Sequence, residues 1–146
     1  MRLILFLLLP LFLISSCTGN SEERVYTNNV KIVTSTKWKY DADAIREAAK
    51  STLKTNQDED LMNGALSRLQ NAAFIFNEDG SMMLDAPQKQ YLGTWELTKD
   101  SKEFFILLEG TSSIGNTVSK ITKDRIVLAA DYEKGSIFPK IFIPTE

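Results

Sequence analysis

Residues 73–84, Ala-Phe-Ile-Phe-Asn-Glu-Asp-Gly-Ser-Met-Met-Leu, decide the fold. Two short apolar segments flank Asn77-Glu78-Asp79-Gly80, a turn in which Gly80 can adopt a positive φ angle. Apolar side chains alternate along both segments, as in a β-hairpin that buries one face. The side chains expected to face the core are Phe74, Phe76, Met82 and Leu84. The stretch therefore predicts antiparallel β-structure.

The chain stays β-rich after this hairpin. Turn signals such as Lys99-Asp100-Ser101-Lys102 and Lys123-Asp124 separate short apolar or alternating segments. The predicted strands cover residues 90–98, 103–109, 117–122, 125–130 and 137–143. The segment 103–109 is apolar on both faces, so we expect it to be covered on both sides, with a helical hairpin as the outer cover.

Upstream of the hairpin, apolar and polar residues alternate from Val30 to Tyr40, and only Val33 breaks the pattern. A period of two over this length predicts a half-buried first strand. The side chains assigned to its inner face are Val30, Ile32, Thr34, Thr36, Trp38 and Tyr40.

Two amphipathic helices are predicted between this strand and the hairpin. Asp41 or Asp43 can cap the first, which runs to about Lys54, and the second begins within Asp58-Glu59-Asp60. They form an αα-hairpin insertion over about residues 41–71. The fold class is mainly β with α+β content: an eight-stranded antiparallel barrel or a strongly curled sheet, with the αα-hairpin inserted after the first strand.

The N-terminal segment has the layout of a secretory signal peptide. Met1-Arg2 is positively charged, Leu3–Ile14 is apolar apart from Pro10, and the small pair Ser15-Ser16 follows. The apolar run is too short to span a bilayer, which requires about 20 residues. We expect residues 1–16 to be removed.

Ile14-Ser15-Ser16-Cys17 resembles the lipobox of bacterial lipoproteins. The resemblance implies that Cys17, the only cysteine in the chain, is lipidated, and that residues 17–29 form a flexible tether. Two or three acyl chains are sufficient for stable anchoring. Ser21-Glu22-Glu23 resembles a surface-export signal of Bacteroidota lipoproteins, although a solvated linker has the same composition. The expected location is the outer membrane, with the domain facing the periplasm or the cell surface.

The rest of the chain looks like the small lipocalin-like domains of many Bacteroidota lipoproteins. The resemblance covers about residues 36–143 and implies one barrel domain at residues 30–146. The motifs that carry it are Trp38-Lys39-Tyr40, Phe74-x-Phe76-x-x-Asp79-Gly80-Ser81, Tyr91-Leu92-Gly93-Thr94-Trp95-Glu96-Leu97 and Ile121-Thr122-Lys123-Asp124-Arg125-Ile126-Val127-Leu128. It implies a binding module for a small apolar ligand or an envelope component.

Six aromatic side chains are the candidates for an interior ligand site: Trp38, Tyr40, Phe74, Phe76, Tyr91 and Trp95. An eight-stranded barrel holds either its own side chains or one small ligand. Because six aromatic residues would occupy much of that space, a filled core is the stronger expectation. The alternative function is therefore a structural or protein-interaction lipoprotein, such as an accessory subunit or an inhibitor.

Composition argues against several other classes of protein. The chain has no histidine, which removes the commonest general base and metal ligand. The acidic residues Asp41, Asp43 and Asp58-Glu59-Asp60 stand at predicted helix starts, where the helix dipole favours them, so they predict caps and not a metal site. With 17 basic and 19 acidic residues and no basic cluster, nucleic-acid binding is not expected. We expect no enzyme activity and no cofactor.

Overall fold

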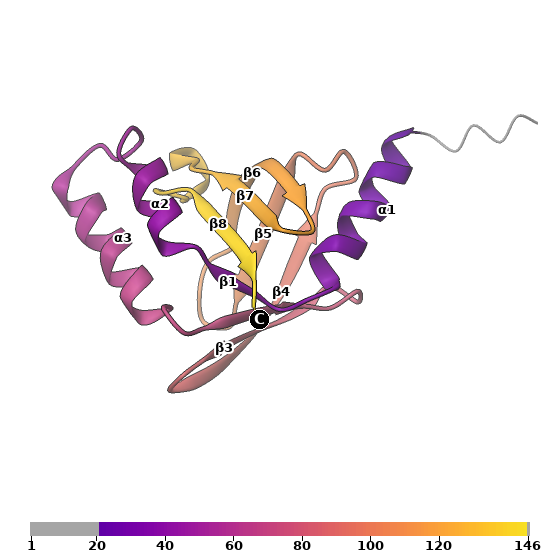
Figure 1. The fold of residues 1–146 in the computed structure, drawn as a ribbon, viewed down its shortest axis with the longest axis horizontal. Coiled ribbons are helices and arrows are strands. Elements are labelled where there is room, and N and C mark those ends of the chain that lie inside the picture. Colours follow the sequence, from indigo (N-terminus) through magenta and orange to yellow (C-terminus); the bar gives the residue numbers. More distant parts are fainter. Residues whose placement is uncertain (1–20, 146) are drawn as a thin grey trace, which may run out of the picture.

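The computed structural model describes residues 21–145. These residues form a closed antiparallel barrel of eight strands, together with three α-helices and one short 3-10 helix (Figure 1). Each strand pairs with its neighbours in the sequence, and β1 pairs with β8 to close the barrel. The barrel prediction is confirmed, and the open curled sheet is not what forms.

The elements follow the chain in a simple order. The strands are β1 (Trp38–Tyr40), β2 (Ala73–Phe76), β3 (Ser81–Ala86), β4 (Lys89–Leu97), β5 (Glu103–Leu108), β6 (Ile114–Thr122), β7 (Arg125–Ala129) and β8 (Lys140–Pro144). The helices are α1 (Ser21–Thr34), α2 (Ala42–Ala49), α3 (Asn56–Arg68) and the 3-10 helix η1 (Tyr132–Lys134).

The helix α1 takes the place of most of the predicted first strand and of part of the predicted tether. Its acidic first turn suits a helix N-terminus. Tyr26, Val30 and Val33 recur at helical spacing and pack on the barrel core, with Val33 completely buried. Val33, which breaks the strand-like alternation in the sequence, is thus the residue of this segment that packs in the barrel core. Only Trp38–Tyr40 remains a strand, and residues 17–20 of the tether lie outside the described residues.

The predicted αα-hairpin is present between β1 and β2. The side chain of Asp41 accepts a hydrogen bond from the Ala44 amide at 3.1 Å and caps α2. Thr55 and Asp58 form a reciprocal capping box that starts α3. The helix therefore begins earlier than predicted, because Thr55 can supply this cap.

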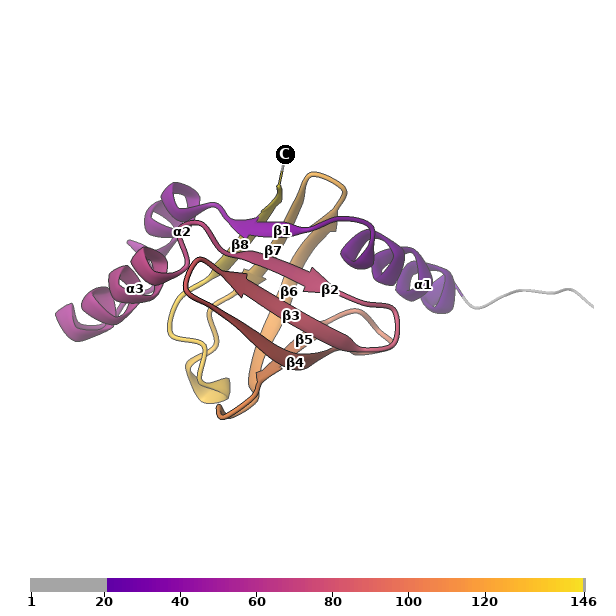
Figure 2. The same ribbon diagram turned by 90° about the horizontal axis from the view of Figure 1, so that it is seen from below.

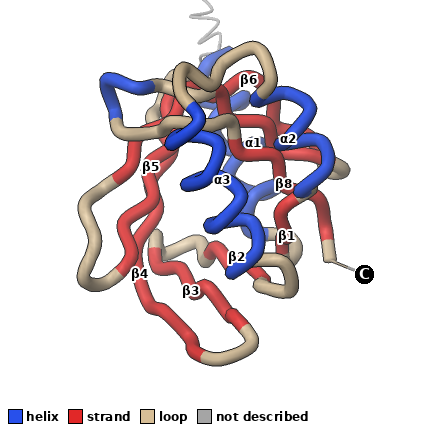
Figure 3. The backbone as a smooth tube through the Cα atoms, turned by 90° about the vertical axis from the view of Figure 1, so that its left-hand side faces the viewer, coloured by secondary structure: helices blue, strands red, loops and turns tan. Residues whose placement is uncertain are grey.

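The helical hairpin covers a different part of the barrel from the one predicted. Ile45 and Leu66 pack against Ile141 of β8, on the face that points away from the barrel interior. The pair lies at the end of the barrel opposite α1 (Figures 2 and 3). The outer face of β5 is not covered in this way, and Leu107 is 40% exposed. The prediction of a doubly covered strand was wrong.

The last strand is shorter and later than predicted. Residues 137–139 lie outside β8, which begins at Lys140. Before it, Asp131 and Ser136 form an isolated β-bridge around η1, and Gly135 takes the positive φ angle of 79° that ends η1. Pro139, which lacks an amide hydrogen, accordingly stands just before the strand.

Candidate ligand site at the barrel mouth

Five of the six predicted aromatic side chains pack in the barrel interior. Trp38, Phe74, Phe76 and Trp95 are buried, and Tyr40 packs against them. The ring centroids of Phe76 and Trp95 are 5.6 Å apart, and those of Tyr40 and Phe74 are 4.9 Å apart. Such separations are typical of interlocked aromatic rings.

Two further phenylalanines, Phe104 and Phe142, complete this packing. Phe104 lies with its ring centroid 5.4 Å from that of Trp95, and Phe142 lies 5.1 Å from Phe74. Of the pockets described below and two others around residues 21–145, none is lined by Trp38 or Trp95. The interior around these residues is thus filled by aromatic side chains, which was the stronger of the two expectations from the sequence.

Tyr91 is the exception among the six aromatic candidates. It shares the inward-facing side of β4 with Trp95, but 37% of it is exposed. The pairing of β4 with β5 ends at the pair Gly93–Leu108. Tyr91 therefore lies on a part of β4 that has no partner residue on β5. Tyr91 shares a cleft with residues of the β3–β4 turn, the end of β5 and the C-terminal turn of α3.

Tyr91 lines this cleft of about 700 Å³, which we call the mouth cleft. Its apolar side chains are Leu69, Leu84, Ala86, Pro87, Tyr91 and Leu108, and the charged residues that line it are Arg68, Lys89 and Glu109. Leu84 is buried and forms the floor, while Leu69, Ala86 and Leu108 are half-buried against the core. The cleft is in the size range of small-molecule sites, and most of its lining surface is apolar.

A second apolar feature lies on the outside of the barrel. Outward-facing side chains of β2, β3, β4 and β5 form a continuous row, which we call the outer row: Ile75, Met83, Leu92 and Leu107. Leu92 is 55% exposed. The row borders a shallow pocket of about 770 Å³. Leu107 is exposed as well, whereas Ile75 and Met83 are half-buried. Apolar side chains gathered on a surface are typical of interaction sites.

A buried lysine that sequence reasoning missed lies at the start of β8. The ammonium group of Lys140 donates hydrogen bonds to Asn116 Oδ1 at 2.8 Å and to Ser136 Oγ at 2.7 Å. Lys140 forms no ion pair among the described residues, and burial lowers its pKa to about 8. Lys140 pairs with Leu128 of β7, and its side chain therefore points into the barrel. The sequence alone does not show this pairing.

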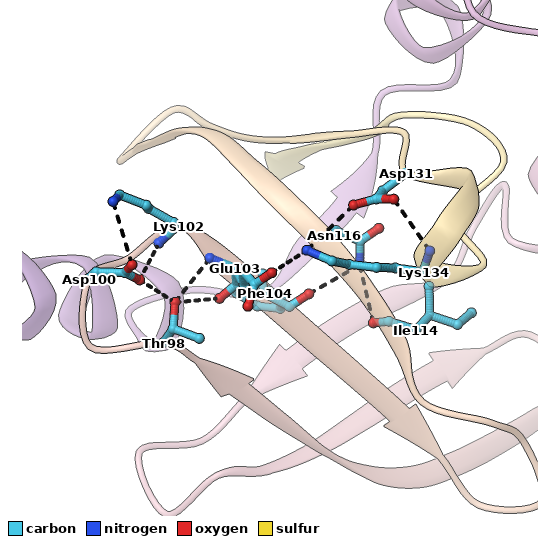
Figure 4. Close-up of polar contacts among 9 residues, drawn as sticks. All are labelled: Thr98, Asp100, Lys102, Glu103, Phe104, Ile114, Asn116, Asp131 and Lys134. Atoms are coloured by element: carbon cyan, nitrogen blue, oxygen red, sulfur yellow. Dashed lines mark hydrogen bonds and ion pairs between the residues drawn. The ribbon is translucent and has the colours of Figure 1, made fainter.

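An ion-pair cluster next to this lysine holds η1 against the barrel (Figure 4). The Lys134 ammonium contacts the Glu103 carboxylate and lies 3.5 Å from Asp131 Oδ2. The hydrogen bond to Glu103 raises the pKa of Lys134. Asn116 Nδ2 also donates to the Phe104 carbonyl at 3.2 Å. Each of these groups is used within the fold, so we assign the cluster a structural role.

Two further properties of the described residues bear on function. Within residues 21–145, no helix is long and apolar enough to cross a membrane. In the same part of the chain, no three His, Cys, Asp or Glu side chains lie close enough together to hold a metal ion.

Comparison with solved structures shows a likeness in fold. No family model matches the chain, and no curated protein matches it. The barrel is similar to the crystal structure of a DUF4847 family protein from Bacteroides vulgatus, with 13% sequence identity and a TM-score of 0.49. The alignment covers 77% of this chain and 94% of that one.

Proposed function

We propose that this chain is a non-catalytic, lipid-anchored binding module of the cell envelope, and that it binds a small apolar ligand in the mouth cleft. The observation that carries the proposal is the position of Tyr91 over an apolar floor, outside a barrel interior that is already filled. Inward-facing side chains of β3, β4 and β5 line the cleft, so a ligand there would bury apolar surface without opening the core.

The anchor is the second part of the proposal. Cys17 lies outside the described residues, and the support for its lipidation is the lipobox-like sequence. The Cys17→Ala chain is expected in the soluble fraction, whereas the unmutated chain should fractionate with the outer membrane. Protease treatment of intact cells would then distinguish a surface-exposed domain from one that faces the periplasm. A Cys17→Ala chain that remains in the membrane fraction would refute the anchor.

The cleft can be tested with a neutral apolar dye such as Nile red, whose fluorescence increases in apolar surroundings. The protein would be the mature Cys17→Ala chain, which keeps every described residue. Ala86→Trp should fill the cleft and remove saturable binding. Leu92→Ala, which changes only the outer row, should leave binding intact. Binding that survives Ala86→Trp would place the dye elsewhere.

The outer row supports a second candidate function, an accessory or inhibitory lipoprotein that acts through protein contacts. A row of four outward apolar side chains across neighbouring strands is unusual where the barrel surface should be polar. A photo-crosslinking amino acid at Leu92 in cells should then give a defined adduct, and the same group at Glu96, also on the outer face of β4, should not. Identical adduct patterns at both positions would contradict this function.

A further inference from the structure

Arg68 and Lys89 bring two positive charges to the lining of the mouth cleft. Arg68 is the last residue of α3, and Lys89 is the first residue of β4. Within the described part of the chain, neither forms an ion pair with a carboxylate. The Lys89 ammonium lies 4.9 Å from the centroid of the Tyr91 ring, which places its charge beside the aromatic wall of the cleft.

Glu109 is the third charged residue that lines the cleft, so the net formal charge there is positive. Its main-chain amide donates a hydrogen bond to the Leu92 carbonyl at 2.9 Å, which fixes its backbone beside β4. The cleft therefore combines an apolar floor at Leu84 with a charged edge on which cations outnumber anions.

We propose that the ligand of the mouth cleft is a single-chain amphiphile with a carboxylate head group, that is, a free fatty acid. This inference rests on the proposed function, because it assumes that the cleft binds a ligand. The alkyl chain would lie on Leu84 and Leu108, and the carboxylate would meet Arg68 and Lys89. An arginine guanidinium presents paired donors that match a carboxylate, which makes Arg68 the stronger contact.

The position of the anchor favours a ligand from the aqueous phase over a lipid still held in the bilayer. Only three residues separate Cys17 from Ser21, the first residue of α1, and the four intervening Cα steps reach at most about 15 Å. The helix α1 and the α2–α3 pair lie at opposite ends of the barrel (Figure 2). A lipid on Cys17 would hold the α1 end near the membrane, and the mouth cleft would point away from it.

The test compares decanoate with 1-decanol by titration calorimetry, using the mature Cys17→Ala chain. Decanoate should bind about ten-fold more tightly than the alcohol, which shares its chain but lacks the charge. Arg68→Gln and Lys89→Gln should each weaken decanoate binding and leave decanol binding unchanged. Glu109→Gln should tighten decanoate binding, since it removes the one negative charge among the three charged side chains. Lys99→Gln, in the turn at the other end of β4, is the matched control.

The possible failures are distinguishable. Equal affinity for decanoate and decanol, both abolished by Ala86→Trp, would overturn the carboxylate assignment and keep the apolar cleft. Absence of binding by either compound would overturn the proposed function itself. Decanoate binding that persists in Ala86→Trp would place the site elsewhere and overturn both.

Discussion

The indole Nε1–H of Trp38 donates a 2.8 Å hydrogen bond to the main-chain carbonyl of Val33. Both residues are completely buried, and the bond links the last turn of α1 to β1. It also satisfies one of the carbonyl groups that a helix leaves unpaired at its C-terminus. The helix α1 is thus part of the folded domain.

Val33→Ala is expected to lower the free energy of unfolding by about 1–3 kcal/mol, because it removes buried methyl groups and leaves a cavity. Val25→Ala, on the same helix but at a side chain that is 53% exposed, should change it by less than about 0.5 kcal/mol. Urea unfolding of both variants measures the difference. Equal effects would show that α1 does not pack on the barrel in solution.

Gly93→Ala should destabilise the protein by roughly 1–3 kcal/mol or more, since overpacking a well-packed site carries a cost of this size. A Cβ atom at position 93 would lie 2.2 Å from the carbonyl oxygen of Leu107, so β4 and β5 would have to separate. Gly64→Ala is the matched control, because a Cβ there meets no atom within 4 Å beyond its chain neighbours and the backbone of its own helix. Its higher helix propensity should instead stabilise α3 by up to about 1 kcal/mol. Thermal unfolding of the two variants should therefore shift in opposite directions.

Phe76→Ala should reduce the free energy of unfolding by about 3–5 kcal/mol, as expected when a large buried ring is removed from an aromatic cluster. Ile75→Ala, one residue earlier on the outward face of β2, should have a much smaller effect. Guanidinium unfolding followed by tryptophan fluorescence measures both. Comparable losses would argue against a filled interior.

Lys140 should make stability rise with pH in the weakly alkaline range. Its pKa is about 8 in the folded chain and ordinarily 10.5, so the unfolded chain binds more protons between these values. Between about pH 7.5 and pH 9.5 the free energy of unfolding should gain about 1–2 kcal/mol from this residue. The pKa of Tyr40 is also raised by burial, but this opposes folding only above pH 10, where the unfolded side chain ionises.

Lys140→Met is the control for this pH dependence. The variant keeps a long side chain and loses the titrating amine, so its stability should lack the gain between the two pH values. Urea unfolding at both pH values in the two proteins measures the difference. Identical pH dependence in both would assign the gain to other groups.

The strand pattern and the helix caps could be predicted from local sequence. The hairpin at residues 73–84 forms as expected, with Phe74, Phe76, Met82 and Leu84 all buried. Its turn also follows the sequence signal, since Gly80 has a φ angle of 82°. The alternation of apolar and polar residues and the turn residues depend on neighbours a few positions away, so these features can be predicted without a structure.

The segment from Val30 to Thr34 could not be assigned in this way. Alternating apolar residues over five positions fit a strand, and Tyr26, Val30 and Val33 fit a helix face equally well. Packing at the end of the barrel favours the helix over the strand, because a helix there buries Val33 completely. This is a non-local contribution to the free energy that local periodicity does not contain.

The sequence by itself determined the mainly β class, as a barrel or a curled sheet, together with the αα-hairpin insertion and the candidate aromatic residues. Closure of the barrel through the pairing of β1 with β8 is a result of the tertiary structure. The tertiary structure alone decided which of those aromatic side chains meet solvent. Trp95 and Tyr91 have the same inward direction on β4, but β5 ends opposite Gly93. Trp95 is therefore covered by the paired strands and buried, whereas Tyr91 lies past the end of β5 and is exposed. Side-chain direction follows from the period of a strand, whereas burial depends on where the neighbouring strands end.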